Sequence, residues 1–470
     1  MKNSNTLKGC LLLICFFLVY PQFANAQNSD FNVFYRSSFY GSTEGTMPFW
    51  LSANVNGKVD PNSSNFINEL GFSRELKVTR NLSLAAGSNV VARLSEDNSF
   101  HFTELYSSIS YHAFRLDIGR FNQPIGLNNH SLSAGSMMMS TNAIPIPRIT
   151  ISNPEFVNVP FSNGFLEYKG MYSHGWFTEN RFVDDAYLHQ KYLYLKINIG
   201  KFSGIGGIVH NALWGGTSEN PNVGKLPQSF SDYLRVVTGS SADPDSDAPG
   251  GEISNTLGNS VAAYEFGATY DFESMTVSAT RLFYLEDGVS RRFRSPWDGV
   301  WGLNINFKDQ SRLLQAITYE HINTRRQDSR SFQARGRANY YNHFLYRSGW
   351  SNYGRVNGIP LITYNPEANR IDNNILVGHH IGASGYLKSD LGYKILATYT
   401  RNYGTVGGKV PPETVDFPSR REDQYSFLLN INYRVPGTSA LTAGLSLSVD
   451  TGEMYRENLG IMAGLTWNLN

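Results

Sequence analysis

The chain has 470 residues, with 40 Lys and Arg against 39 Asp and Glu, a formal net charge of +1 at pH 7. This balance gives no indication of a nucleic-acid partner, which a strongly basic surface would favour. Aromatic residues make up 13% of the chain and there are 43 glycines, which fits the aromatic girdles and strand kinks of a β-barrel but also a large soluble sandwich or propeller.

Residues Met1–Ala26 have the three parts of a secretory signal peptide: a lysine-containing start, an apolar run from Leu11 to Tyr20, and Ala24-Asn25-Ala26 at the expected cleavage site. The apolar run is shorter than the ~20 residues that a spanning helix needs. We therefore expect a mature domain of residues 27–470. Both cysteines, Cys10 and Cys15, fall in the part removed, so no disulfide or thiol chemistry is expected.

Segments in which apolar and polar residues alternate recur along the rest of the chain. Clear examples are 82–94, 105–111, 192–198, 262–271, 275–283, 301–307, 391–399, 425–433, 441–449 and 459–469. Weaker candidates are 31–40, 48–55, 67–76, 166–172, 314–322 and 375–387. Strands of this length with one apolar and one polar face predict an all-β fold, an antiparallel transmembrane β-barrel of about 16 to 18 strands.

Short and long connections alternate between these segments, as they do when short turns face the periplasm and long loops face outward. Residues 217–257 are rich in Pro, Ser, Gly and Asp, and residues 323–339 are rich in arginine, so both are expected to be solvated loops. Residues 121–161 differ, because Met137, Met138, Met139 and Ile146 need burial. We expect this segment to fold back into the lumen or to form a small plug.

A search for catalytic signatures finds no HExxH, P-loop or GxSxG sequence, so neither an enzyme nor a cofactor is expected. His379 and His380 are neighbours on a predicted strand, so their side chains point to opposite faces and cannot share a metal ion. No metal site is predicted.

One cluster of binding candidates joins arginine with aromatic residues. It contains Arg325, Arg326, Arg330, Arg335, Arg337 and Arg347, with Tyr340, Tyr341 and Phe344 among them. Guanidinium groups match carboxylates and phosphates, and aromatic rings stack on sugar faces. The cluster predicts an acidic polysaccharide site at the barrel mouth; contact with lipopolysaccharide phosphates, or ordinary lumen charge, explains it equally well.

A second cluster lies between residues 173 and 216 and contains His174, Arg181, His189, Lys191, His210 and Trp214. Two of its histidines stand at the ends of a predicted hairpin, so they can meet at one rim. Three histidines near carboxylates could bind zinc or act as acid and base. Hydrogen-bonded histidines inside a polar lumen are the simpler interpretation.

Several short sequences together carry a family resemblance. They are Leu132-Ser133-Ala134-Gly135-Ser136, Ser140-Thr141-Asn142-Ala143-Ile144-Pro145-Ile146-Pro147-Arg148, Val159-Pro160-Phe161, His174-Gly175, 187–194, and His210 with Trp214-Gly215-Gly216. In these pieces the chain resembles the capsule assembly protein Wzi family, in particular its members from Bacteroidetes. The resemblance implies an outer-membrane barrel of about eighteen strands with some helical content, which attaches capsular polysaccharide to the cell surface as a lectin and is not an enzyme.

From the clusters and the resemblance together we expect capsular or another surface polysaccharide as the partner. The candidate binding residues are Arg148, His174, Arg181, His189, Lys191, His210, Trp214, Arg325, Arg326, Arg330, Tyr340 and Tyr341. Outer-membrane lipid, lipopolysaccharide and the barrel assembly machinery are further expected partners of a monomer. Because the last residue is Asn470 and not an aromatic, Trp467 and Leu469 would have to serve that machinery.

Two other functions remain open. In a passive porin the arginine cluster would be a selectivity ring. A barrel-embedded lipid hydrolase would need a histidine within hydrogen-bond reach of a serine at the lipid-facing rim.

Overall fold

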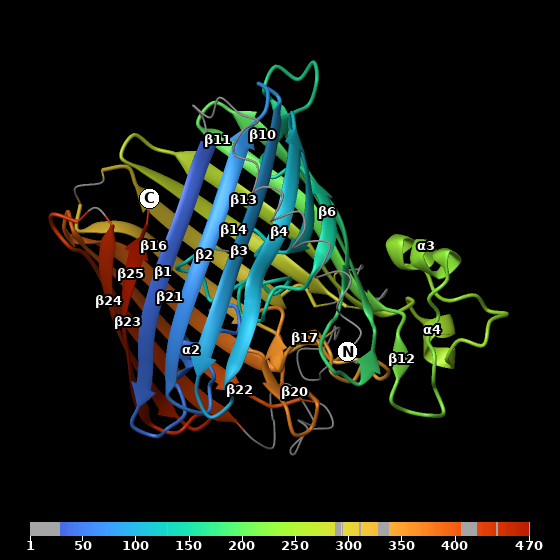
Figure 1. Ribbon diagram of the computed structural model, residues 1–470. Helices are drawn as coiled ribbons and strands as arrows, with labels where there is room; N and C mark the ends of the chain where they lie inside the picture. Colours follow the sequence, from blue (N-terminus) through green and yellow to red (C-terminus); the bar gives the residue numbers. More distant parts are fainter. Residues whose placement is uncertain are drawn as a thin grey trace.

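The computed structural model describes residues 29–128, 130–286, 293, 295–309, 312–327, 338–405, 421–438 and 440–469. The predicted signal peptide, 1–26, and the candidates Arg330, Arg335 and Arg337 lie outside these residues. Within them the chain forms a closed antiparallel β-barrel (Figure 1).

The wall is one sheet that closes on itself where the first strand pairs with the last. Its strands are β1 (Ser29–Ser42), β2 (Asn65–Lys77), β3 (Leu82–Leu94), β4 (Ser99–Tyr111), β5 (Phe114–Arg120), β6 (Arg148–Ser152), β7 (Val157–Asn158), β8 (Leu166–Trp176), β10 (Tyr187–Ile199), β11 (Phe202–Trp214), β13 (Asn259–Asp271), β14 (Met275–Leu285), β15 (Gly299–Phe307), β16 (Leu314–Asn323), β21 (Leu376–Lys388), β22 (Leu391–Asn402), β23 (Glu422–Arg434), β24 (Leu441–Gly452) and β25 (Asn458–Asn468). β6 and β7 pair with the same edge of β8 and act as one interrupted strand, so the barrel has 18 strands, as the resemblance implied.

The remaining elements are short and belong to the connections. They are α2 (Phe49–Ser52), β9 (Val183–Asp184), β12 (Thr217–Ser218), α3 (Phe230–Thr238), α4 (Gly250–Ser254), β17 (Ser351–Asn352), β18 (Arg355–Val356), β19 (Thr363–Asn365) and β20 (Arg370–Asn373). None of the helices in the described ranges is long and apolar enough to span a membrane.

The alternating sequence pattern becomes an apolar outer face and a polar inner face. On β23 the outward Phe427 is 44% exposed and the inward Ser426 is 4% exposed. On β24 the outward Leu447 is 41% exposed and the inward Ser448 is 0% exposed. Since successive side chains of a strand point to opposite faces, this alternation fixes the register of the wall. It confirms the predicted barrel with an apolar outside.

The long connections gather at one end of the barrel, as predicted, although the short connections 95–98 and 453–457 lie at that end too. The turns at 78–81, 112–113, 200–201, 272–274 and 389–390 lie at one end, where β1 begins and β25 ends. The long connections, 43–64, 121–147, 215–258 and the one before β21, lie at the other end.

Two long connections fold into the lumen. The first lumen segment, residues 121–147, buries Met137, Met138 and Ile146 completely. The second lumen segment, residues 338–375, buries Tyr340 and Trp350 completely and carries β17 to β20. The predicted plug is thereby confirmed for 121–147. The rest of the predicted plug segment, residues 148–161, does not enter the lumen, because its strands β6 and β7 belong to the barrel wall.

The connection between β1 and β2 also enters the lumen, through α2. Its Trp50 Nε1–H donates to the Thr398 hydroxyl of β22 over 3.1 Å, and the Phe49 N–H donates to Asp450 of β24 over 2.8 Å. Residues 48–55 were expected to be a strand, and that prediction was wrong. The segment packs its apolar side chains against the inside of the wall as a single helical turn instead of joining the sheet.

Residues 215–258 form an outer lobe, which carries α3 and α4 and lies outside the barrel wall (Figure 1). Its core contains Val236, Ala242 and Leu257, which pack against Ala212 and Trp214 of β11. The prediction of a solvated polar loop at 217–257 was therefore wrong for this part of the lobe. The apolar residues are sparse in sequence but converge on one patch of the wall.

Candidate functional site

Hydrogen bonds between the two lumen segments hold them together. The Trp350 indole N–H donates to the Met138 carbonyl over 2.9 Å, and the Tyr341 hydroxyl donates to the Met137 carbonyl over 2.5 Å. The Ser140 hydroxyl donates to the Gly358 carbonyl over 2.6 Å. These donors satisfy carbonyl groups that would otherwise be buried without partners, so the segments form one packed plug.

The wall holds this plug through inward-facing polar side chains. Glu320 of β16 accepts bonds from the Ser133 hydroxyl at 2.7 Å and the Ala134 N–H at 2.8 Å. His380 of β21 lies 2.8 Å from the Leu132 carbonyl, whereas His379 faces outward and contacts the Tyr319 hydroxyl at 2.8 Å. The two adjacent histidines therefore point to opposite faces, as predicted.

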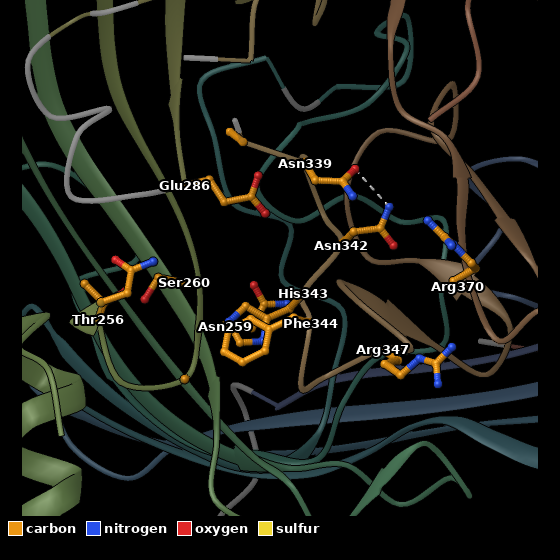
Figure 2. Close-up of a pocket in the computed structure, with 13 residues that line it drawn as sticks. Thr256, Asn259, Ser260, Glu286, Asn339, Asn342, His343, Phe344, Arg347 and Arg370 are labelled. Carbon is orange, nitrogen blue, oxygen red and sulfur yellow. Dashed lines mark hydrogen bonds between the residues drawn. The ribbon is translucent and has the colours of Figure 1, made fainter. Parts of the chain in front are cut away.

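A cavity of about 380 Å³ opens at the long-loop end, between the outer lobe and the second lumen segment (Figure 2). Its lining residues are Asn255, Thr256, Gly258, Asn259, Ser260, Glu286, Ala338, Asn339, Asn342, His343, Phe344, Arg347 and Arg370. Thr256 and Ser260 lie on one side, while Asn342, Arg347 and Arg370 lie on the other. We call this cavity the mouth pocket.

The mouth pocket is lined by an arginine side chain and an exposed aromatic ring. The Arg347 guanidinium lies 4.9 Å from the centre of the Phe182 ring, which holds a cation at the exposed edge. The Phe344 side chain is 59% exposed. The Phe344 ring packs over Gly251 of α4. A Cβ atom at position 251 would lie 2.1 Å from the ring, so only glycine leaves room for the ring there.

Amide groups supply the other polar atoms. Asn259 is 1% exposed, and neither its amide nitrogen nor its amide oxygen has a hydrogen-bond partner within the described residues. The Asn342 amide donates to Asn339 over 3.2 Å and to the Ile371 carbonyl over 3.1 Å. Buried amides without protein partners are costly unless a ligand or water satisfies them, so a polar partner at Asn259 would be stabilising.

His343 is neutral in this setting. Burial lowers its pKa from 6.5 to about 4. Its Nδ1 accepts bonds from the N–H groups of Leu345 and Tyr346, both at 3.3 Å, which assigns the proton to Nε2. The positive charge of the pocket therefore comes from arginine.

Glu252 is buried next to the pocket, at 1% exposure in α4. Its carboxyl group accepts a bond from the Gly258 N–H over 2.6 Å. Burial raises the pKa of Glu252 to about 7, and the Gly258 N–H offsets part of that rise. The lobe therefore contains a group that titrates near neutral pH.

Four of the predicted binding residues hold the plug and its surroundings and are not exposed. Arg148 is 2% exposed and donates to the Phe121 carbonyl, with its guanidinium 4.3 Å from that ring. Arg181 is 2% exposed and donates to the carbonyls of Gly349 and Ser351. Tyr340 and Tyr341 are fully buried. These four side chains therefore stabilise the packing of the lumen segments and are not available to a ligand.

Five further candidates lie on the outward face of the wall. They are His174 of β8, His189 and Lys191 of β10, and His210 and Trp214 of β11. The histidines do come together, as the hairpin predicted: His174 pairs with His189 across the two strands, and the His189 and His210 rings are 6.0 Å apart. The interpretation as lumen histidines was wrong, because α3 covers them from outside.

Arg325 and Arg326 follow β16 at the long-loop end. The Arg325 guanidinium lies 5.0 Å from the Tyr403 ring, and the Arg326 N–H bonds to Asp298 at 3.1 Å. Neither lines the mouth pocket, whereas Arg347, from the same arginine-rich stretch, does. Of the predicted arginine and aromatic cluster, Arg347 and Phe344 line the mouth pocket, and their role in binding stays a prediction.

One contact bears on the hydrolase alternative. His210 Nε2 lies 3.2 Å from the Ser260 hydroxyl on the outward face near the rim. Ser260 is 9% exposed. Among the described residues, no group of three or more His, Cys, Asp or Glu side chains is arranged to hold a metal ion.

Comparison with known proteins gives a family and a fold. Residues 51–451 match the family described as capsule assembly protein Wzi. The chain is similar in structure to Wzi of Escherichia coli, an outer membrane protein involved in group 1 capsule assembly and described as a carbohydrate-binding β-barrel. That match has 15% identity and a TM-score of 0.58, and covers 99% of this chain and 89% of the other.

Other similar structures are more distant. OccK3 of Pseudomonas aeruginosa is 8% identical over 94% of this chain and 96% of its own, with a TM-score of 0.46. OccK11 of the same species is 10% identical over the same shares, with a TM-score of 0.44. No curated protein matches the chain in sequence.

Proposed function

The chain belongs to the capsule assembly protein Wzi family, and from this premise we propose that it is an outer-membrane lectin that binds capsular polysaccharide and retains it at the cell surface. The barrel is placed in the outer membrane with its long connections outward. Binding is non-covalent and involves no catalysis. The mouth pocket is the proposed contact site, and an acidic polysaccharide is the proposed ligand.

The observation that supports this proposal is the chemistry of the mouth pocket. Arg347 and Arg370 offer guanidinium groups, which pair with carboxylates bidentately. The exposed Phe344 ring offers an apolar surface for a sugar face, the Asn259 amide offers a donor and an acceptor, and the Asn342 amide oxygen offers an acceptor for hydroxyl groups.

The filled lumen favours a lectin over a passive porin. A porin needs a continuous water-filled path, whereas the first lumen segment is bonded to Glu320 and His380 of the wall, and Asn373 of the second donates to Asn402 of β22 over 3.0 Å. A plugged barrel instead presents a fixed outer surface. The second lumen segment forms one side of the pocket, so the plug builds the proposed binding site.

Titration calorimetry of the purified protein in detergent with capsular polysaccharide tests the proposal. Phe344→Ala and Arg347→Gln should each weaken binding. Phe161→Ala is the matched control, because Phe161 is a fully exposed aromatic on the β7–β8 turn at the short-turn end, 102% exposed. Equal affinity of all four proteins for the glycan would place the site elsewhere, and no binding to several native glycans would contradict the lectin function.

Other contacts complete the proposal. The protein acts as a monomer surrounded by outer-membrane lipid and lipopolysaccharide. The barrel assembly machinery inserts it, with Trp467 and Leu469 of the C-terminal strand region as the recognised apolar residues. Both side chains are exposed on the outer face, at 54% and 47%, which supports this assignment.

A lipid hydrolase is the second candidate, supported by the 3.2 Å contact between His210 and Ser260. A serine paired with a histidine on the lipid side is the arrangement that such an enzyme requires. However, Ser260 is only 9% exposed and lines the mouth pocket, so a lipid ester would have to reach it through that pocket. Fatty-acid release from phospholipid vesicles that Ser260→Ala abolishes would establish this function in place of the lectin.

A further inference from the structure

Helix α3 packs on the side of the wall that faces away from the lumen. On β10 the inward Gln190 donates to the Met139 sulfur of the plug, so its neighbours His189 and Lys191 must point outward. Further along the same outward face, Leu193 is 49% exposed. His189 is completely buried although it points outward, because Tyr233 of α3 packs against it.

Tyr233 is the residue of α3 that makes this contact. Its hydroxyl lies 2.6 Å from the Tyr172 hydroxyl of β8. Its ring centre lies 5.4 Å from that of His174, 5.7 Å from that of His189 and 5.3 Å from that of Trp214. Lys191 in addition donates to the Val237 carbonyl near the C-terminal end of α3. The helix is therefore fixed to the wall by aromatic packing and polar bonds.

The face of α3 beside Tyr233 is apolar and exposed, and the Phe230 and Tyr233 ring centres are 6.4 Å apart. Phe230 is 75% exposed and Leu234 is 50% exposed. The two residues are four positions apart, so they share one face of the helix. The capping box at Ser229, whose hydroxyl accepts from the Asp232 N–H, fixes where the helix begins and hence where this face points.

This face continues the lipid-facing surface of the barrel. On the strands that α3 covers, the next outward residues include Trp176, Leu193 and Ile208, which are 38%, 49% and 47% exposed. A helix packed beside these residues has its outer face at the depth where the apolar belt ends and headgroups begin. No rearrangement is needed for the Phe230 and Leu234 side chains to meet acyl chains.

We propose that α3 is an interfacial helix, and that Phe230 and Leu234 insert into the bilayer leaflet at the long-loop end of the barrel. Amphipathic helices bind membranes in this way, with the axis in the interface and the apolar face in the acyl boundary. The outer lobe also supplies Asn255, Thr256 and Gly258 to the mouth pocket. The leaflet contact therefore supports one wall of that pocket.

Site-specific fluorescence tests this inference. Residues 27–470 contain no cysteine, so a cysteine introduced there is unique once the predicted signal peptide has been removed. Phe230→Cys and Leu234→Cys are labelled with an environment-sensitive dye in barrels reconstituted into phosphatidylcholine vesicles, and quenched with iodide. Asp245→Cys is the matched control, since Asp245 is an exposed residue of the same lobe.

The expected result is blue-shifted emission and several-fold weaker iodide quenching at 230 and 234 than at 245. Equal quenching at the three positions in vesicles would overturn the inference. Protection at 230 and 234 that disappears when the protein is diluted in excess lipid would also overturn it, because the cover would then be a second copy of the chain. None of these outcomes depends on glycan binding, so the lectin proposal stands or falls separately.

Discussion

Removing the Trp350 side chain should loosen the plug. Trp350 is completely buried and donates its indole N–H to the Met138 carbonyl over 2.9 Å, so it joins the second lumen segment to the first. Trp350→Ala removes the ring and the bond together. Trp350→Phe keeps most of the packing and removes only the donor.

The two variants should differ in size of effect. Truncating a buried Trp to Ala costs about 3–5 kcal/mol, because it loses packing and leaves a cavity. Losing only the donor leaves a buried carbonyl without a partner, which costs about 1–3 kcal/mol. At roughly 1.4 kcal/mol per factor of ten, Trp350→Ala should raise the equilibrium for plug opening by about 150- to 4,000-fold, and Trp350→Phe by about 5- to 150-fold.

Amide hydrogen exchange and planar-bilayer conductance measure this opening. Exchange of residues 132–140 should accelerate in the order wild type, Trp350→Phe, Trp350→Ala, while exchange in β23 and β24 stays unchanged. The wild type should show no steady large current, and Trp350→Ala should show open events. Unchanged exchange at 132–140 in Trp350→Ala, or a large steady current through the wild type, would refute this view of the lumen.

Three further predictions follow from the mouth pocket, the outer lobe and the N-terminus. Arg347→Gln should weaken calorimetric binding of an acidic polysaccharide by roughly 10- to 100-fold, since charge-assisted hydrogen bonds contribute about 1.5–3 kcal/mol, and an equal loss for a neutral glycan would exclude a carboxylate contact. Burial raises the pKa of Glu252 above its unfolded value of 4.5 to about 7, so its contribution to lobe stability should be fully present below pH 4.5 and lost as pH rises to about 7. The loss is on the order of 3 kcal/mol, seen as a lower opening free energy of the lobe at pH 8 than at pH 5 when exchange rates are divided by the intrinsic rate at each pH, and Glu252→Gln should remove this difference. Mass spectrometry of the protein from the envelope should find a chain that begins at Gln27, and an intact Met1 would contradict the predicted signal peptide.

The barrel wall could be predicted from the sequence because each spanning strand must present one face to lipid and one to the lumen. That requirement imposes alternation with period two, and segments such as 82–94 and 275–283 coincide with β3 and most of β14. The same criterion failed at 48–55. In a short apolar stretch with prolyl and aromatic residues, periodicity does not distinguish a strand from a helix. Residues 49–52 form α2 because of their contacts with the inner wall of the barrel, which the local sequence does not reveal.

The mouth pocket could be predicted only in part. Arg347 and Phe344 stood out because arginine and aromatic residues were dense there. Asn259 and Asn342 gave no comparable signal, because asparagine is common in turns and their convergence depends on how 215–258 and 338–375 pack.

The outward histidines show the converse problem. His174, His189 and His210 were correctly expected to meet at a rim. Strand alternation alone could not assign their face, since a polar residue ordinarily points to the lumen of such a barrel. The cover that permits the outward orientation, α3, lies more than twenty residues further along the chain from His210 in the lobe, with Tyr233 as the contacting residue.

Capsule retention on living cells tests the central claim most directly. A strain that lacks the gene is complemented with the wild type, with Phe344→Ala/Arg347→Gln, or with Phe161→Ala, and polysaccharide is measured on cells and in the medium at equal amounts of folded barrel. The account predicts attached capsule with the wild type and the Phe161 variant, and release into the medium with the double variant. Capsule that stays attached to cells carrying the double variant, or to cells without the protein, would contradict it.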